Sequence, residues 1–183
     1  MRRLWLVLAV LLAPTAAGAH DHFADVCFAF SDVQASALVG PRVTFAKTLP
    51  RPPSRDGVVR TLSLIADFGA NWGSHDDTDV RHTLFMGGLR YTMAGDSHQQ
   101  HLPFVEVLLG GVHVENGERR RGRGKRADQG DADPALAIGT GYEYVMSGSP
   151  GGWGIRVQGE YVVRPDDITP RLSVGIVKRF KKS

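Results

Sequence analysis

Hydrophobic and polar residues alternate along most of this chain. Strict alternation is typical of β-strands, because successive side chains point to opposite faces of the strand. Clusters of Gly, Pro, Asp and Ser separate the alternating segments and indicate turns. The pattern predicts about eight strands, each of about ten residues. They lie at residues 24–31, 40–49, 59–73, 81–93, 104–115, 135–146, 153–164 and 171–180.

The clearest of these segments separate into an apolar face and a polar face. In the segment at 153–164, Ile155 and Val157 share one face, whereas Arg156 and Glu160 lie on the other. An antiparallel protein built in this way has two physical solutions. A soluble barrel or sandwich turns its apolar faces inward around a core. A transmembrane barrel turns them outward to lipid and encloses the polar faces.

Charged residues and glycines occur together on the polar faces, and this combination favours the transmembrane barrel. Glycine weakens a strand and contributes nothing to an exposed sheet face. A narrow interior filled with long Arg and Glu side chains does need small neighbours. We therefore expect an all-β fold, a single antiparallel up-and-down transmembrane β-barrel of about eight strands, with paired charges inside. The expected interior charges are Asp67, Arg90, Glu106, Glu143, Arg156, Glu160 and Arg179.

Aromatic residues support the same architecture. They lie on the apolar faces toward the ends of the predicted strands, where a transmembrane barrel meets the membrane surface. The expected aromatic girdle consists of Trp72, Tyr91, Tyr144, Trp153, Tyr161 and Phe180. Lys47 also falls on an apolar face, and we expect it near a membrane boundary, where its long stem can extend to water. The predicted strand at 104–115 is ambiguous, since both of its faces are largely apolar.

The N-terminal residues indicate export. Arg2 and Arg3 precede an apolar run that is followed by small residues, which is the pattern of a secretory signal peptide. The run of about ten apolar residues falls short of the roughly twenty that a membrane-spanning helix needs. We expect a cleaved signal peptide at residues 1–19 and an outer-membrane β-barrel domain at residues 20–183.

Charge and cysteine content narrow the classes further. The formal net charge is +3, and removal of a signal peptide with two arginines and no acid lowers it to +1. This balance indicates no nucleic-acid partner. The single cysteine, Cys27, cannot form a disulfide within the chain, so packing and backbone pairing must stabilise the exported fold.

Three C-terminal segments carry a resemblance to a known family. They are AIGTGYEY (137–144), IRVQGEY (155–161) and PRLSVGIVKRF (170–180). Together they resemble the small outer-membrane β-barrels of OmpA/OmpX type. The resemblance implies an outer-membrane location, both chain ends in the periplasm, and insertion by the outer-membrane assembly machinery through a terminal aromatic residue. Here Phe180 takes that place, but KKS follows it, and Lys178 stands where the family is normally apolar.

Two charged segments are candidate surface loops. An arginine-rich segment could bind lipopolysaccharide phosphates, since guanidinium groups match phosphate oxygens, and the alternative is a solvated loop without a ligand. Its basic residues are Arg119, Arg120, Arg121, Arg123, Lys125 and Arg126. The acidic segment at 74–79 lacks the spacing of a calcium loop, and His20 to His22 would chelate a metal only weakly. We expect outer-membrane lipid as a partner and a solvated basic loop, for which lipopolysaccharide is the candidate ligand, without a metal site or a cofactor.

The expected function is a structural or surface-interaction role of a monomeric barrel, without enzymatic activity. About eight strands leave an interior that side chains just fill, so an open porin is not expected. Two alternatives remain open: a secreted soluble β-barrel that binds a small apolar ligand, and a lipid A-modifying outer-membrane enzyme. For the enzyme, His82, His113 and Ser173 are the available residues, and the sequence contains no nucleophile elbow.

Overall fold

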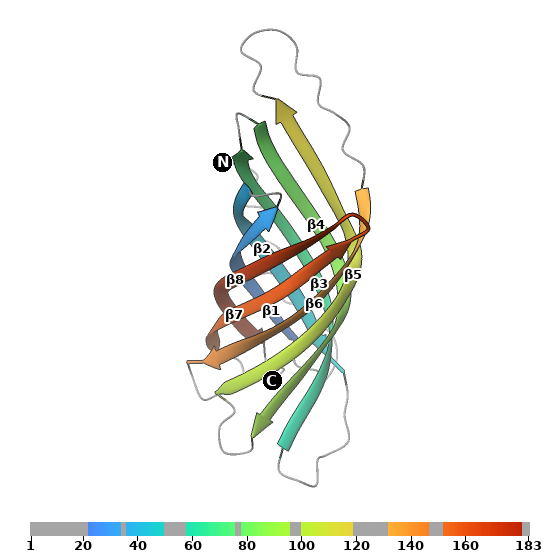
Figure 1. The fold of residues 1–183 in the computed structure, drawn as a ribbon. Coiled ribbons are helices and arrows are strands. Elements are labelled where there is room, and N and C mark those ends of the chain that lie inside the picture. The colour runs from blue at the N-terminus through green and yellow to red at the C-terminus, as the bar shows by residue number, and fades with distance from the viewer. Residues whose placement is uncertain are drawn as a thin grey trace.

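The computed structural model describes residues 22–33, 36–49, 58–75, 78–95, 100–118, 132–146 and 152–180. These residues form eight strands that follow one another in chain order and close into a single antiparallel barrel (Figure 1). The strands are β1 (His22–Val33), β2 (Ser36–Thr48), β3 (Val58–His75), β4 (Thr78–Gly95), β5 (His101–Glu118), β6 (Ala132–Val145), β7 (Trp153–Arg164) and β8 (Asp167–Phe180). The expected fold is confirmed, whereas the expected signal peptide at residues 1–19 lies outside the described residues.

The two ends of the barrel are distinguished by the chain path. β1 begins where β8 ends, because His22 pairs with Phe180. We call this the terminal end, and the antiparallel order places the connections β2–β3, β4–β5 and β6–β7 there as well. The other four connections lie at the opposite end, which we call the loop end (Figure 1). The described ranges contain no helix long and apolar enough to cross a bilayer.

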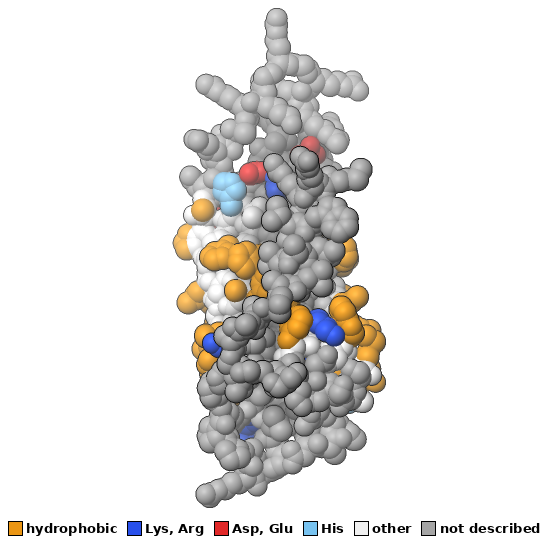
Figure 2. Space-filling model, turned by 180° about the vertical axis from the view of Figure 1, so that it is seen from behind, with side chains coloured by type: hydrophobic (Ala, Val, Ile, Leu, Met, Phe, Trp, Pro, Cys, Tyr) orange, Lys and Arg blue, Asp and Glu red, His pale blue; other side chains and the backbone are white. Residues whose placement is uncertain are grey.

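Side chains alternate between the interior and the outer surface along the strands. On β7, Arg156 and Gln158 point inward and are buried, whereas Ile155 and Val157 point outward and are exposed. Large apolar side chains are exposed on all eight strands, and Figure 2 shows them on the middle of the barrel. Soluble monomers rarely expose apolar surface on this scale, so hydrocarbon is the environment that fits it. The alternative of a soluble barrel around an apolar ligand does not fit this arrangement.

Most strands extend beyond the alternating segments that predicted them, and three are much longer than a membrane crossing requires. β3, β4 and β5 each have 18 residues, whereas a tilted strand needs only about 10 to cross a bilayer. Pairing of β3 with β4 continues to His75 and Thr78. Much of the acidic segment at 74–79 therefore belongs to a hairpin, with Ser74 in β3 and Asp79 in β4. Backbone pairing does not require apolar alternation, so the sequence pattern ends these strands too early.

The interior contains apolar side chains as well as charges. The ambiguous strand, β5, turns Phe104, Leu108 and Val112 inward and Val105 and Val107 outward. Leu108 and Val112 belong to a cluster of buried apolar side chains that reaches most strands. Its members are Ala46, Ile65, Leu84, Met86, Leu108, Val112, Ala135, Ala137, Val162 and Val177.

Gly40 and Gly141 are two of the glycines that allow close approach inside the wall. A Cβ atom at Gly40 would overlap the carbonyl oxygen of Ala70 on β3, so a larger residue would push the two strands apart. A Cβ atom at Gly141 would overlap the ring of Phe104 and lie 2.8 Å from the carbonyl oxygen of Val157. Small residues on the inner faces thus make room for large ones, which is the reason the sequence pattern places them there.

Candidate functional site

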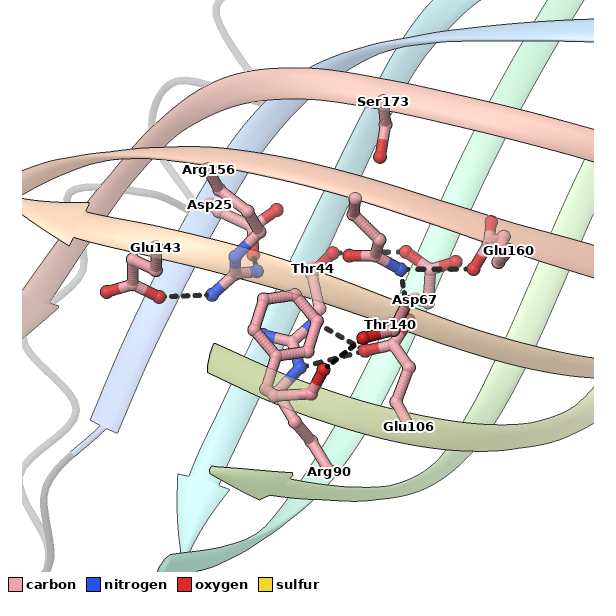
Figure 3. A network of polar contacts seen from close by, with 12 residues as sticks. Asp25, Thr44, Asp67, Arg90, Glu106, Thr140, Glu143, Arg156, Glu160 and Ser173 are labelled. Atoms are coloured by element: carbon pink, nitrogen blue, oxygen red, sulfur yellow. Dashed lines mark hydrogen bonds and ion pairs between the residues drawn. The ribbon is translucent and has the colours of Figure 1, made fainter. Parts of the chain in front are cut away.

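The inward faces of the strands carry a network of paired charges. It contains five acids and five arginines, and most of these side chains are almost completely buried. They are Asp25, Arg42, Asp67, Arg90, Glu106, Glu143, Arg156, Glu160, Arg171 and Arg179. Burial of an unpaired ion away from water destabilises a fold by roughly several kcal/mol. Equal numbers of acids and arginines allow each buried charge to be paired. Figure 3 shows part of this network in the barrel interior.

Arg42 on β2 is the centre of the larger group of charges. Its Nε donates to Asp67 at 2.7 Å, and its Nη1 donates to Glu160 at 3.2 Å and to Ser173 at 3.2 Å. Its Nη2 donates to Glu106 at 3.3 Å and again to Glu160 at 3.3 Å. These bonds use the full set of guanidinium donors. One buried side chain therefore links β2 to β3, β5, β7 and β8.

Arg171 and Asp67 complete this group. The Asp67 carboxylate accepts hydrogen bonds from Arg42, from Thr44 at 3.1 Å and from Arg171 at 3.1 Å. Arg171 also donates through Nε to Glu160. Each acid therefore faces two arginines, and each arginine faces more than one acid. Such reciprocal pairing satisfies the buried charges more completely than separate pairs would.

A second group of charges lies toward the terminal end. Arg156 donates to Asp25 and, at 2.9 Å, to Glu143, which also accepts from Arg179 at 2.6 Å. Arg179 is only partly buried, so this group reaches the end of the barrel.

Phe104 and Arg90 join the two groups. Arg90 pairs with Glu106 at 2.7 Å, and its guanidinium lies 4.3 Å from the centre of the Phe104 ring. The guanidinium of Arg156 lies 5.3 Å from the same ring centre. An aromatic face attracts cations. The Phe104 ring can therefore lie between two arginines and stabilise both guanidinium groups, which a purely apolar side chain would not do. Charged side chains and an aromatic ring therefore lie together in the interior at this level.

The structure places every expected interior charge on the inner face and pairs them. Arg90 pairs with Glu106, and Arg156 pairs with Glu143. Sequence reasoning missed Asp25, Arg42 and Arg171, although alternation carries a signal for each. These residues share a strand face with small or polar neighbours, and apolar residues occupy the opposite face.

The expected girdle residues all point outward. Trp72, Tyr144, Trp153, Tyr161 and Phe180 are exposed, and Tyr91 is partly buried. They lie near both ends of the barrel, since Trp72 is close to the end of β3 and Trp153 begins β7.

Outward-facing polar groups accompany the girdle at the terminal end. His101 forms a hydrogen bond with the hydroxyl of Tyr142, and its ring lies 5.2 Å from that of Tyr144. The ammonium group of Lys178 lies 4.8 Å from the centre of the Trp153 ring. Lys178 therefore points outward. The family that the sequence resembles normally has an apolar residue at this position.

A small cavity lies inside the barrel above the charged groups, toward the loop end. Its volume is about 10 Å³, and Asn71, His82 and Arg171 are among the residues that line it. Each of these three has a buried polar atom without a hydrogen-bond partner: Asn71 Oδ1, His82 Nε2 and Arg171 Nη1. The space is sufficient for about one water molecule, and three polar atoms are enough to hold it.

The candidate catalytic residues do not converge on one face of the wall. His82 and Ser173 point inward, and Ser173 accepts its hydrogen bond from Arg42. His113 points outward at the loop end, where its Nε2 lies 3.4 Å from Glu115. The basic segment from Arg119 to Arg126 lies outside the described residues, between β5 and β6.

Several solved structures share this fold. The chain is similar to Neisserial surface protein A, with 13% identity, a TM-score of 0.60, and 89% of this chain and 98% of that chain covered. It is similar to Ail, the attachment invasion locus protein of Yersinia pestis, with 12% identity, a TM-score of 0.55 and coverage of 90% and 100%. The N-terminal β-barrel domain of Pseudomonas aeruginosa OprF aligns with 12% identity, a TM-score of 0.50 and coverage of 86% and 97%.

No protein-family model matches the chain, and no curated protein sequence matches it. The structural likeness, together with the outward apolar surface, defines the class: a small eight-stranded transmembrane β-barrel with the fold of outer-membrane proteins.

Proposed function

We propose that this protein is exported by its signal peptide, resides as a monomer in the outer membrane, and acts through its loops as a structural or surface-interaction protein without catalytic activity. The observation that carries the proposal is the distribution of side chains, with apolar residues outside and paired ions inside. Membrane fractionation combined with heat-modifiable gel mobility tests the location. A protein recovered in the soluble periplasmic fraction would overturn it.

The proposed barrel does not conduct ions as an open pore. Support comes from the side chains that cross the interior, namely Arg42, Arg90 and Phe104, and from the cavity of about 10 Å³ above them. Purified protein in planar bilayers is expected to give no porin-like current steps. Regular steps from the wild-type barrel would contradict a filled interior.

The basic segment from Arg119 to Arg126 is proposed to bind polyanions, in the first place the phosphate groups of lipopolysaccharide. Its arginines match phosphate geometry, and glycine spacers allow the segment to adapt to a ligand. The structurally similar Ail of Yersinia pestis has been crystallised in complex with the heparin analogue sucrose octasulfate. That complex is a property of Ail, and it supports the plausibility of polyanion binding by a barrel of this shape.

A lipopolysaccharide titration tests this loop. Replacement of Arg119, Arg120 and Arg121 by Gln is expected to weaken binding by about tenfold or more, since charge-assisted bonds to phosphate are among the stronger hydrogen bonds. The control replaces Arg51 and Arg55 by Gln, because the chain order puts them between β2 and β3 and not between β5 and β6. Equal loss in both variants would indicate a general charge effect and contradict a site in this loop.

A further inference from the structure

The outer surface near the terminal end carries cations on three neighbouring parts of the wall. Lys47 lies near the end of β2, Arg60 near the start of β3, and Lys178 near the end of β8. Strand alternation turns all three side chains outward, and Lys47 is exposed. His101, at the start of β5, faces the same surface.

Acids are absent from this surface among the side chains that the structure describes. The acids nearest the terminal end, Asp25 and Glu143, point inward and pair with Arg156. At the loop end the outer surface is mixed, since Glu115 lies 3.8 Å from Arg81 and 3.4 Å from His113. On the face seen in Figure 2, acidic side chains appear only toward the loop end, whereas Lys and Arg side chains appear there and also lower on the barrel.

Lys178 is held in a position where its charge lies next to an apolar wall. Its ammonium group lies over the Trp153 ring at 4.8 Å, and Trp153 pairs with Lys178 across β7 and β8. The cation–π contact keeps the ammonium group close to the barrel surface, beside exposed Ile155 and Ile176. A ligand at this place must therefore present an anionic group next to hydrocarbon.

Lys47 lies within reach of the same ligand. His22 pairs with Lys47 on one side and with Phe180 on the other, so one strand, β1, separates the two lysines. Two strand spacings correspond to roughly 10 Å, and each lysine stem can extend several ångströms along an apolar wall. A single headgroup can contact both ammonium groups when the Lys178 stem turns from the Trp153 ring toward β1.

We propose that Lys47 and Lys178, supported by Trp153 and Arg60, bind the phosphate group of an anionic glycerophospholipid in the membrane leaflet at the terminal end. A phosphodiester at the boundary between water and hydrocarbon meets both requirements of this surface, anionic charge and adjacent acyl chains. The site is separate from the basic loop at 119–126, so it holds whether or not that loop binds lipopolysaccharide.

Lipid that co-purifies with the barrel tests this site. The folded full chain is equilibrated with detergent micelles that contain phosphatidylglycerol and phosphatidylcholine in equal amounts, and mass spectrometry measures the bound ratio. The wild type is expected to enrich phosphatidylglycerol, by about fivefold for each lysine that contacts it. The variant K47Q/K178Q is expected to bind both lipids equally. Retained enrichment in that variant would overturn the proposal.

The matched control is Arg81→Gln, which removes an outward-facing cation at the loop end and should leave the enrichment unchanged. Heat-modifiable mobility verifies that each variant is folded.

If K47Q/K178Q does not fold, the wild type is tested in about 1 M salt instead, because the Debye screening length is then about 3 Å. Enrichment that persists at this salt concentration refutes the site. Displacement of the lipid by soluble glycerol phosphate would also overturn it, since the ligand would then be a free phosphate and not a membrane lipid.

Discussion

At the scale of single residues, the barrel depends on how completely its buried ions are paired. Arg42 shows this most clearly, since its guanidinium bonds to three acids and one hydroxyl from four other strands. Removal of one partner in such a group leaves the others as uncompensated charges. The contribution of Arg42 is therefore larger than that of any exposed ion pair on the same barrel.

Replacement of Arg42 by Met is expected to lower the free energy of unfolding by about 3–5 kcal/mol, because Asp67, Glu106 and Glu160 lose a shared cation. Urea titration of the protein folded in lipid vesicles measures the change. Arg81→Met is the control, since the Arg81–Glu115 pair is about half exposed and should contribute less than about 1 kcal/mol. Similar losses in the two variants would contradict a network centred on Arg42.

The sequence could indicate which residues face inward but not which residues pair. Alternation alone assigns Arg156, Glu160 and Asp67 to the polar faces. The partners of Arg42 lie 25, 64 and 118 positions away along the chain. Their meeting depends on the register of several strand pairs and on the closure of β1 with β8, which single-strand patterns do not contain. Asp25 and Arg42 were missed because each lies near the edge of a weakly patterned segment.

At the scale of strands, register decides where large and small side chains meet. β5 could not be oriented from its own sequence, since both faces are apolar. Its pairing with β6 places Phe104 opposite Gly141, and the ring then lies between Arg90 and Arg156. The glycine-rich face of β6 is thus the complement of an aromatic side chain on the neighbouring strand.

Replacement of Gly141 by Ala is expected to destabilise the barrel by about 1–3 kcal/mol, because the added methyl group overlaps a ring that cannot move without displacing two arginines. The midpoint of unfolding in urea measures this effect. Gly159→Ala is the matched control on the next strand, since a Cβ atom there meets no atom within 4 Å. Its effect should stay within about 0.5 kcal/mol. An equal loss at Gly159 would show that strand flexibility, and not the contact with Phe104, causes the change.

Strand ends were the least predictable part of each element. The hairpin of β3 and β4 continues through Ser74 and Asp79, where residues are polar on both faces. Outside the membrane both faces of a strand can contact water, so the alternation that marks a strand disappears while its hydrogen bonds remain. The sequence therefore predicted the number and the order of the strands. It located the boundary of the apolar band more closely than it located the ends of the strands.

At the scale of the whole molecule, closure of the ring gives every strand two hydrogen-bonded neighbours. β1 and β8 pair over most of their lengths, from His22 with Phe180 to Ser31 with Arg171. A closed ring with ion pairs across its interior is expected to resist detergent at room temperature. Unheated protein should therefore migrate faster on a gel than boiled protein, and identical mobilities would contradict a closed barrel that persists in detergent.

The central claim is that apolar side chains contact hydrocarbon while the inner faces are sealed from it. Nuclear Overhauser contacts between lipid and methyl-labelled wild-type protein in nanodiscs test this claim most directly. We predict cross-peaks from acyl-chain protons to the methyl groups of Leu64, Val157 and Ile176, and none to those of Leu108 and Val177. Lipid contacts at Leu108 and Val177 without any at Leu64, Val157 and Ile176 would contradict the account.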